Sequence, residues 1–187
     1  MQSDAELVAK AKAGDELAFR QLVQRHEQLV RSTVIGMLGT GPDAEDVAQE
    51  VFIRFFRSLV NFRGESKLST YLCRIAINLS INALKSRQRR YRWLSRVRPG
   101  EDEIFELPDH SADPAKRDTR EWVHKAIEIL APDFRSVIVL RMIDGYSVRE
   151  TAEILNIPEG TVASRLTRAQ KKLREVFEKW KLLDIAH

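Results

Sequence analysis

Apolar side chains recur at spacings of three and four residues along most of this chain, which is the period of an amphipathic α-helix. No run alternates apolar and polar residues as a half-buried strand does. In the first half the pattern predicts one helix that Asp15 caps and that ends near Leu38. It predicts a second helix from Asp43 to about Leu59 and a third that begins near Leu68. The chain is therefore predicted to be all-α, and its expected caps are Asp15, Asp43, Asp133 and Ser147.

The inward faces of these helices are defined by their apolar residues. On the second helix they are Ala44, Val47, Ala48, Val51, Phe52, Phe55 and Leu59. On the third helix they are Leu68, Leu72, Ile75, Ala76, Leu79 and Ala83. Stripes of this width are typical of helices that pack into a common core.

The composition excludes several classes of protein. With 187 residues, of which 43% are hydrophobic, the chain can bury a core and is not a disordered segment. No apolar stretch approaches the roughly 18 residues of a membrane span, and the N-terminus lacks a signal-peptide pattern. The single cysteine, Cys73, excludes an internal disulfide and a cysteine-based zinc site. We therefore expect a cytoplasmic protein that is not embedded in a membrane and needs no metal or cofactor.

The net charge of +4 is distributed unevenly along the chain. Residues 1–95 carry 15 Lys or Arg against 10 Asp or Glu, and residues 122–187 carry 11 against 9. Residues 96–121 between them carry 5 against 8, include three prolines and show little helical period. This organisation predicts two basic domains on a flexible linker, and the second domain begins with helices over 122–130 and 133–143.

A helix-turn-helix is predicted in the second domain. Ser147 and Glu150 have the spacing of a capping box that opens a helix. Asn156 can take the left-handed conformation that turns the chain, and Pro158 can begin the next helix. The outward face of that helix consists of Thr161, Ser164, Arg165, Arg168 and Lys172. Such a face can enter the DNA major groove, although a merely solvated helix face is the alternative.

A second basic surface is predicted on the third helix. Its polar face consists of Arg74, Asn78, Asn82, Lys85 and Arg89. Lys85 to Arg98 contain seven Lys or Arg residues, two aromatic residues and no acid, which suits a nucleic-acid backbone with stacked bases. A basic helix end that enters the linker is the alternative. The loop from Phe62 to Ser69 favours the first interpretation, because its aromatic ring, glycine and hydroxyls could hold an extruded base.

The outward face of the second helix is acidic. It consists of Asp46, Gln49, Glu50, Ile53 and Arg57, so that an apolar side chain lies among carboxylates. Acidic groups are unsuited to a DNA surface, and this face better fits a protein that presents Arg or Lys.

These segments together resemble a known family. Three segments of the first half resemble region 2 of the extracytoplasmic-function (ECF, group 4) sigma factors of bacterial RNA polymerase. They are Asp43-Ala-Glu-Asp-Val-Ala-Gln-Glu-Val-Phe-Ile-Arg, Asn61-Phe-Arg-Gly and Ser69-Thr-Tyr-Leu-Cys-Arg-Ile-Ala-Ile-Asn78. Region 4 resembles Asp144-Gly-Tyr-Ser-Val-Arg-Glu-Thr-Ala-Glu-Ile-Leu-Asn-Ile-Pro-Glu-Gly-Thr-Val-Ala-Ser-Arg-Leu. The resemblance implies a region 2 bundle over 1–95, a linker over 96–121 and a region 4 helix-turn-helix over 122–187.

The resemblance also implies a role for each surface. Polymerase binding is expected at Asp46, Gln49, Glu50 and Ile53. Contacts to the promoter −10 element are expected at Phe62, Arg63, Ser69, Thr70, Arg74, Asn78, Asn82, Lys85 and Arg89. Contacts to the −35 element are expected at Thr161, Ser164, Arg165, Arg168 and Lys172. The implied partners are core RNA polymerase, through its clamp helices and flap, promoter DNA and an anti-sigma factor.

Two other interpretations use some of the same features. A stand-alone transcription regulator explains the helix-turn-helix but leaves the acidic face and the Phe62 loop without a role. An enzyme is disfavoured, because the four histidines lack metal-ligand spacing and Gly39-Thr40-Gly41 is too short for a phosphate-binding loop. The sequence is therefore interpreted as an alternative sigma factor that directs promoter-specific initiation, with no catalytic residue of its own.

Overall fold

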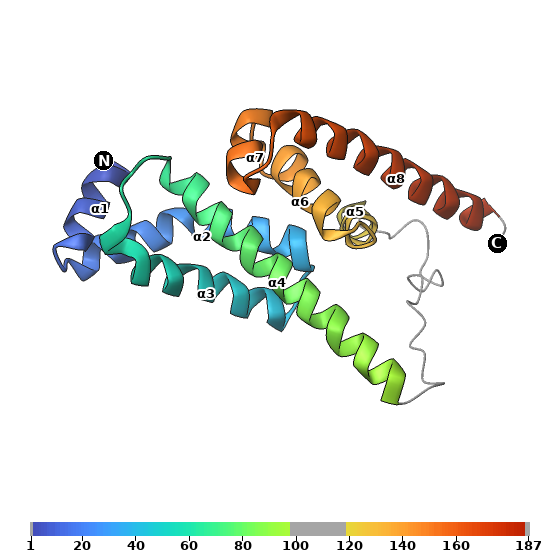
Figure 1. Ribbon diagram of the computed structural model, residues 1–187, viewed down its shortest axis with the longest axis horizontal. Helices are drawn as coiled ribbons and strands as arrows, with labels where there is room; N and C mark the ends of the chain where they lie inside the picture. The colour runs from blue at the N-terminus through green and yellow to red at the C-terminus, as the bar shows by residue number, and fades with distance from the viewer. Residues whose placement is uncertain (1, 98–118, 186–187) are drawn as a thin grey trace.

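The structure is a computed structural model that describes residues 2–97 and 119–185 (Figure 1). All regular structure within these two ranges is helical, which confirms the all-α prediction. The helices form one group from each half of the chain. Most of the predicted linker, 96–121, lies outside the described residues.

The N-terminal group is a bundle of four helices and one short turn. These elements are α1 (Asp4–Lys12), α2 (Glu16–Leu38), α3 (Pro42–Ser58), the 3₁₀ turn η1 (Leu59–Asn61) and α4 (Leu68–Val97). Val51 and Phe55 of α3 and Leu72 of α4 are wholly buried in the shared core, as the helical period predicts. Burial of each such side chain is worth about 1.5–3 kcal/mol relative to exposure.

The first helix, α1, is absent from the predictions because its apolar stripe is short. Its start nevertheless carries a capping box, in which Ser3 Oγ accepts from the Glu6 amide and Glu6 accepts from the Ser3 amide. Asp4 attaches α1 to α2, since its carboxylate lies 2.5 Å from an Arg25 nitrogen and 2.8 Å from His26 Nε2. The S-x-x-E spacing at residues 3–6 was the available sequence signal for this helix.

The cap predictions are right at Asp15 and wrong at Asp43 and Asp133. Asp15 caps α2 by accepting from a backbone amide at 3.0 Å. In contrast, α3 begins at Pro42 and α6 begins at Pro132, and neither start has a side-chain cap. Proline has the helical φ angle and no N–H group to satisfy, so it takes the first helical position. Both aspartates therefore lie inside the first turn, where their negative charge interacts favourably with the positive end of the helix dipole.

The C-terminal group contains the predicted helix-turn-helix. Its elements are α5 (Thr119–Glu128), α6 (Pro132–Ile138), the π-helical turn η3 (Val139–Ile143), α7 (Val148–Leu155) and α8 (Glu159–Ile185). The capping box is confirmed: Ser147 Oγ accepts from the Glu150 amide at 3.2 Å, and Glu150 accepts in return at 3.0 Å. Asn156 has φ 52° and ends α7 in the left-handed conformation. Pro158 immediately precedes α8.

The two groups pack directly against each other. The sequence predicted two domains on a flexible linker and did not predict this contact. Figure 1 shows α6 and α7 lying against the N-terminal bundle. One hydrophobic cluster crosses the boundary. Its members include Met37, Cys73 and Ile77 from the N-terminal group and Val139, Leu140 and Tyr146 from the C-terminal group. The two halves thus share part of a core in addition to having cores of their own.

Candidate nucleic-acid and protein interfaces

The crossing of α7 and α8 is fixed by a small apolar cluster. Ala152 of α7 and Val162 of α8 are buried together with Val137 of α6. The Ile157 amide donates to the Ala152 carbonyl at 3.1 Å, which closes the turn between the helices. This packing turns the polar side of α8 away from the core, as a recognition helix requires.

The predicted −35 surface on α8 contains exposed side chains and side chains held by the domain. Ser164 and Arg168 are exposed, and the Ser164 hydroxyl donates to the Thr161 carbonyl at 3.1 Å within the same helix. Arg165 donates to an Asp133 carboxylate oxygen at 2.8 Å, and Lys172 lies with its Nζ 4.9 Å from the centre of the Phe134 ring. The fifth predicted residue of this surface, half-buried at the start of α8, is Thr161. The ion pair fixes the orientation of the Arg165 guanidinium and neutralises part of the positive charge of this face.

The predicted −10 face of α4 is continuous along the helix. Asn78, Asn82, Lys85 and Arg89 are all exposed on one side of it. Arg74, at the N-terminal end of this face, is half-buried, and its Nη2 donates to the Glu153 carbonyl of α7 at 2.9 Å. The structure therefore places four of these side chains in solvent and attaches the fifth to the other half of the molecule.

The loop before α4 is more firmly packed than a free base-capturing loop would be. The Phe62 ring lies 4.9 Å from the Tyr71 ring and 6.2 Å from the Phe55 ring, centre to centre. Lys12 of α1 donates to the Phe62 carbonyl. Thr70 is buried, with 3% of its surface exposed, while Arg63 is exposed and Ser69 is half-buried. In this conformation the accessible charges of the loop are Arg63, its ion-pair partner Glu65 at 3.9 Å, and Lys67.

The acidic face of α3 is accessible. Asp46 and Gln49 are exposed, and Glu50 accepts from Arg54 Nε at 2.8 Å. The Ile53 side chain is 44% exposed, so the predicted apolar residue among the carboxylates does stand at the surface.

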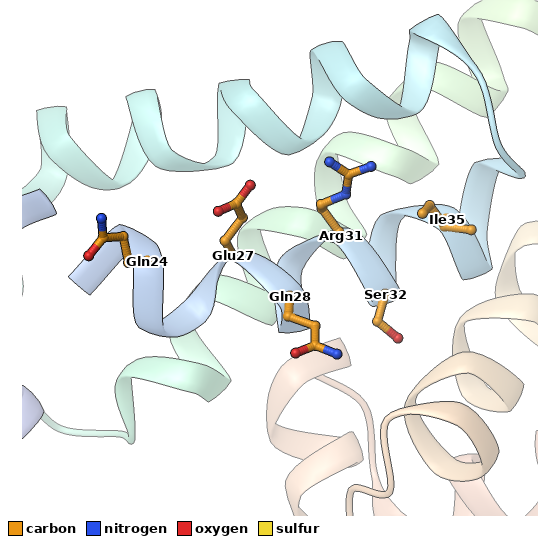
Figure 2. Close-up of a pocket in the computed structure, with 6 residues that line it drawn as sticks. All are labelled: Gln24, Glu27, Gln28, Arg31, Ser32 and Ile35. Atoms are coloured by element: carbon orange, nitrogen blue, oxygen red, sulfur yellow. The ribbon is translucent and has the colours of Figure 1, made fainter. Parts of the chain in front are cut away.

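A groove beside this face adds residues that the sequence predictions missed. It has a volume of about 540 Å³ and lies between α2 and α3. Glu27 and Arg31 of α2 line it opposite Gln49 and Ile53 of α3. Figure 2 shows Glu27 and Arg31 on the side of α2 that faces α3, whereas Ser32 points toward the C-terminal helices. The i, i+4 spacing of Glu27 and Arg31 was the available signal, because it places both on one helix face.

Buried polar groups concentrate where the two halves meet. Burial raises the pKa of Asp144, although hydrogen bonds from Thr33 and Ser32 partly offset the rise. Burial also raises the pKa of Cys73, whose thiol lies 3.0 Å from the Tyr146 hydroxyl. Among the described residues no group of His, Cys, Asp and Glu suits a metal ion. No described helix is long and apolar enough to cross a membrane.

Comparison with known proteins identifies similar chains along nearly the whole length. The sigma-70 region 2 family matches residues 22–90, and the sigma-70 region 4 family matches residues 120–173. The RNA polymerase sigma-H factor of Pseudomonas aeruginosa is 34% identical over 185 residues, which cover 95% of each chain. The ECF RNA polymerase sigma-E factor of Escherichia coli K12 is 38% identical over 178 residues, which cover 91% of this chain and 92% of the relative.

Two solved structures have a similar fold. One is CnrH in complex with the cytosolic domain of CnrY, with a TM-score of 0.69, 25% identity and coverage of 95% of this chain and 99% of that chain. The other is the sigma factor RpoE in complex with the anti-sigma factor NepR from Bartonella quintana. Its TM-score is 0.62 at 25% identity, over 86% of this chain and 96% of that chain.

Proposed function

The chain belongs to the sigma-70 family of RNA polymerase sigma factors, in the extracytoplasmic-function group, and we propose from this premise how its surfaces act. It is an alternative sigma factor, which binds core polymerase and directs initiation at specific promoters. The observation that carries this conclusion is the match to regions 2 and 4, in that order, within one chain. We propose that region 2 corresponds to 1–95, the linker to 96–121 and region 4 to 122–187.

We assign polymerase binding to the acidic face of α3. Asp46 and Gln49 are free to meet the basic side chains of a partner, and Ile53 supplies an apolar contact in the centre. Glu50 is engaged with Arg54, but an exposed i, i+4 ion pair is worth only about 0.3–0.5 kcal/mol. A partner Arg can therefore replace Arg54 at small cost. The proposed partner surface is the pair of clamp helices in the largest polymerase subunit, and region 4 would contact the flap.

Promoter contacts are assigned to α4 and α8. On the −10 side, Asn78, Asn82, Lys85 and Arg89 form the accessible face, and Arg63 extends it into the loop. On the −35 side the accessible residues are Ser164 and Arg168, with Arg165 oriented by Asp133. The remaining predicted contacts are less accessible in this conformation. Thr70 is buried, Lys172 lies over the Phe134 ring, and the half-buried residues are Phe62, Ser69, Arg74 and Thr161.

The energetics of promoter opening require a division of labour. Opening about ten base pairs costs about 14 kcal/mol at about 1.4 kcal/mol for each stacked step. Stacking of a captured base returns only about 1–3 kcal/mol. One or two captured bases therefore cannot melt the duplex. We assign specificity and nucleation to this chain, and catalysis with most of the opening work to the polymerase. The chain itself is proposed to have no catalytic activity and, like its DNA partner, to reside in the cytoplasm.

An anti-sigma factor is the proposed negative regulator. In one of the two similar solved structures the sigma factor RpoE is bound to the anti-sigma factor NepR, and in the other CnrH is bound to the cytosolic domain of CnrY. The groove between α2 and α3 borders the polymerase-binding face, so a protein seated there would compete with polymerase.

Transcription from purified components tests the proposed function. Core polymerase with this chain should produce transcripts from a defined set of promoters of the source genome, and the chain alone should open none of them. The double variant Asp46→Arg, Glu50→Arg reverses two charges of the α3 face. It should lose polymerase binding and keep the helical circular dichroism spectrum of the wild-type chain.

A matched control separates this loss from a general charge effect. Glu175→Arg with Glu178→Arg reverses the same number of exposed charges on α8, away from the α3 face, and should leave binding to the clamp helices intact. Unchanged binding by the Asp46 and Glu50 variant would refute the assignment of this face. A chain that protects promoter DNA unaided and gives no transcript with core polymerase would instead be a stand-alone regulator.

A further inference from the structure

The first helix, α1, ends beside the loop before α4 (residues 62–67). Figure 1 shows the chain between η1 and α4 next to α1. Lys12, the last residue of α1, donates through its Nζ to the Phe62 carbonyl at the start of this loop. The two residues are 50 positions apart in the sequence, so the bond joins α1 to a distant segment of the chain. The match to sigma-70 region 2 begins at residue 22 and therefore gives α1 no role.

The position of α1 in the bundle is fixed at both ends. Leu7 and Ala11 are buried in the core that also contains Leu59 of η1. At the start of the helix the Asp4 carboxylate lies 2.8 Å from His26 Nε2 of α2. Packing and this polar contact together prevent α1 from sliding along its neighbours. The ammonium group at the end of the helix is therefore held within reach of the loop.

Phe62 is held through its backbone as well as through its ring. Its amide donates to the Leu59 carbonyl at 3.2 Å, and its carbonyl accepts from Lys12. Its ring lies between 4.9 Å and 6.2 Å from the rings of Tyr71 and Phe55, centre to centre. The Phe62 carbonyl belongs to the planar peptide unit that leads into the next residue. Fixing its oxygen atom therefore fixes the direction in which the loop leaves the core.

The rest of the loop has weak contacts of its own. Arg63 and Glu65 form an ion pair at 3.9 Å, but their side chains are 84% and 79% exposed, and such pairs contribute little. Gly64 between them has a φ of 71°, which glycine adopts readily. The loop ends where the buried Leu68 begins α4. A short segment with weak internal contacts takes its shape from its two ends, and Lys12 determines one of them.

We propose that Lys12 is a positioning residue for the loop before α4, and that it holds this loop in the shape that captures a base of the −10 element. Lys12 acts through the Phe62 carbonyl and does not itself contact DNA. A loop that is already held in its binding conformation loses little freedom when the base enters, so the bond increases affinity for the base. This proposal rests on the proposed function, because the same loop is assigned to the −10 element.

The test uses holoenzyme assembled from core polymerase and the full-length chain. The probe is a promoter fragment with a double-stranded −35 element and a single-stranded −10 element, taken from a promoter that transcription with purified components has identified. In a series of probes each −10 base in turn is replaced by an abasic nucleotide. The wild-type chain should bind the intact probe more tightly than the probe that lacks the captured base. The ratio of these two affinities measures base capture.

Substitutions on α1 should change this ratio selectively. Lys12→Met removes the donor but keeps an unbranched side chain, and it should lower the ratio about fivefold, which corresponds to the loss of one ordinary hydrogen bond. Lys12→Arg supplies a donor again and should restore the ratio. Lys10→Met removes the same charge from an exposed position of the same helix and should leave the ratio unchanged. All three variants should bind core polymerase and a −35 duplex as the wild-type chain does.

Other outcomes would overturn the positioning role. A wild-type ratio in the Lys12→Met chain would show that the bond does not shape the loop. An equal loss of affinity for the intact and abasic probes, with a lower thermal midpoint, would mean that Lys12 only stabilises the bundle. A fall in the salt dependence of promoter binding by about one phosphate contact would assign Lys12 to DNA itself.

The wild-type chain distinguishes failure of this proposal from failure of the proposed function. If the wild-type chain prefers the intact probe and Lys12→Met does so equally, the −10 role of the loop stands and the positioning role of Lys12 is refuted. If the wild-type chain binds the intact and all abasic probes equally, base capture by this loop is refuted together with the role of Lys12. Absence of transcripts from any promoter would refute the sigma function itself.

Discussion

The Tyr146 hydroxyl lies 3.0 Å from the Cys73 thiol at the boundary of the two halves, and substitutions of this pair should weaken the contact between the halves in steps. Tyr146→Phe removes the hydrogen bond with Cys73, worth about 1 kcal/mol, and should raise the population of molecules in which the two halves are separated (the open state) about fivefold. Tyr146→Ala removes a buried ring, worth about 3 kcal/mol, and should raise it about 100-fold. The two substitutions thus predict a graded series at one position.

The thiol of Cys73 itself reports the opening. It has no exposed surface, and burial raises its pKa, which the hydrogen bonds of Tyr146 and Thr33 offset only in part. A buried thiol that holds its proton reacts slowly with an aromatic disulfide reagent, because the thiolate is the nucleophile. The reaction should therefore pass through the open state. Its rate should rise about fivefold in the Phe variant and about 100-fold in the Ala variant relative to wild type.

Global unfolding would also expose Cys73, so its contribution has to be measured. Opening between the halves exposes less surface than unfolding, and the reaction rate should depend on urea more weakly than the unfolding equilibrium does. Val162→Ala weakens the cluster between α7 and α8, which contains no residue of the N-terminal group, and should leave the thiol rate close to wild type. Equal rates in the wild-type, Phe and Ala chains would refute the inference that Tyr146 holds the halves together.

Other measurements test a helix cap, the DNA surfaces and the pH response. Ser147→Ala removes a capping-box acceptor and should lower the free energy of unfolding of the C-terminal group by about 1 kcal/mol, seen as a lower thermal midpoint. Arg168→Ala should weaken binding of polymerase holoenzyme to a −35 duplex by about 1–3 kcal/mol, whereas Lys85→Ala should reduce the salt dependence of promoter binding by about one phosphate contact. Burial in the closed state raises the pKa values of Cys73 and Tyr146, so this state holds both protons more tightly than the open state does. Their contribution to the contact between the halves should be complete at pH values below 9.0, the ordinary pKa of Cys73, and should be lost as the pH rises above it. A fraction of closed molecules that increases above pH 9.0 would contradict this prediction.

Local signals in the sequence predicted the helices and several of their ends. The Ser147 capping box and the left-handed Asn156 depend on residues within one helical turn, so their chemistry is visible in a short segment. The caps proposed at Asp43 and Asp133 were wrong because a neighbouring proline competed for the same turn and took the first helical position. The acidic face of α3 was also predictable, since helical period alone brings Asp46 and Ile53 to one side.

The contact between the halves was not predictable in this way. It joins Gly36 to Val139 and Cys73 to Tyr146, pairs that are far apart in the chain and follow no shared period. The residues next to Cys73 in the sequence predict that its thiol is buried, but they do not indicate that a tyrosine of the other half packs against it. Such packing depends on three-dimensional shape, which hydrophobic patterning does not specify. Gly36 was the one local hint, as a glycine inside a long helix calls for a close neighbour.

The central claim is that one chain binds both promoter elements through its two halves. The most direct test is the distance between fluorophores attached at the exposed positions Gln21 of α2 and Gln170 of α8, measured in the free chain and again in a complex with core polymerase and promoter DNA. A closed free chain should open when both promoter elements are bound, since those elements are about 85 Å apart along the duplex. The predicted result is a lengthening of tens of ångströms that requires both polymerase and a promoter with intact −10 and −35 elements. A distance that is the same in the free chain and in the promoter complex would contradict the account.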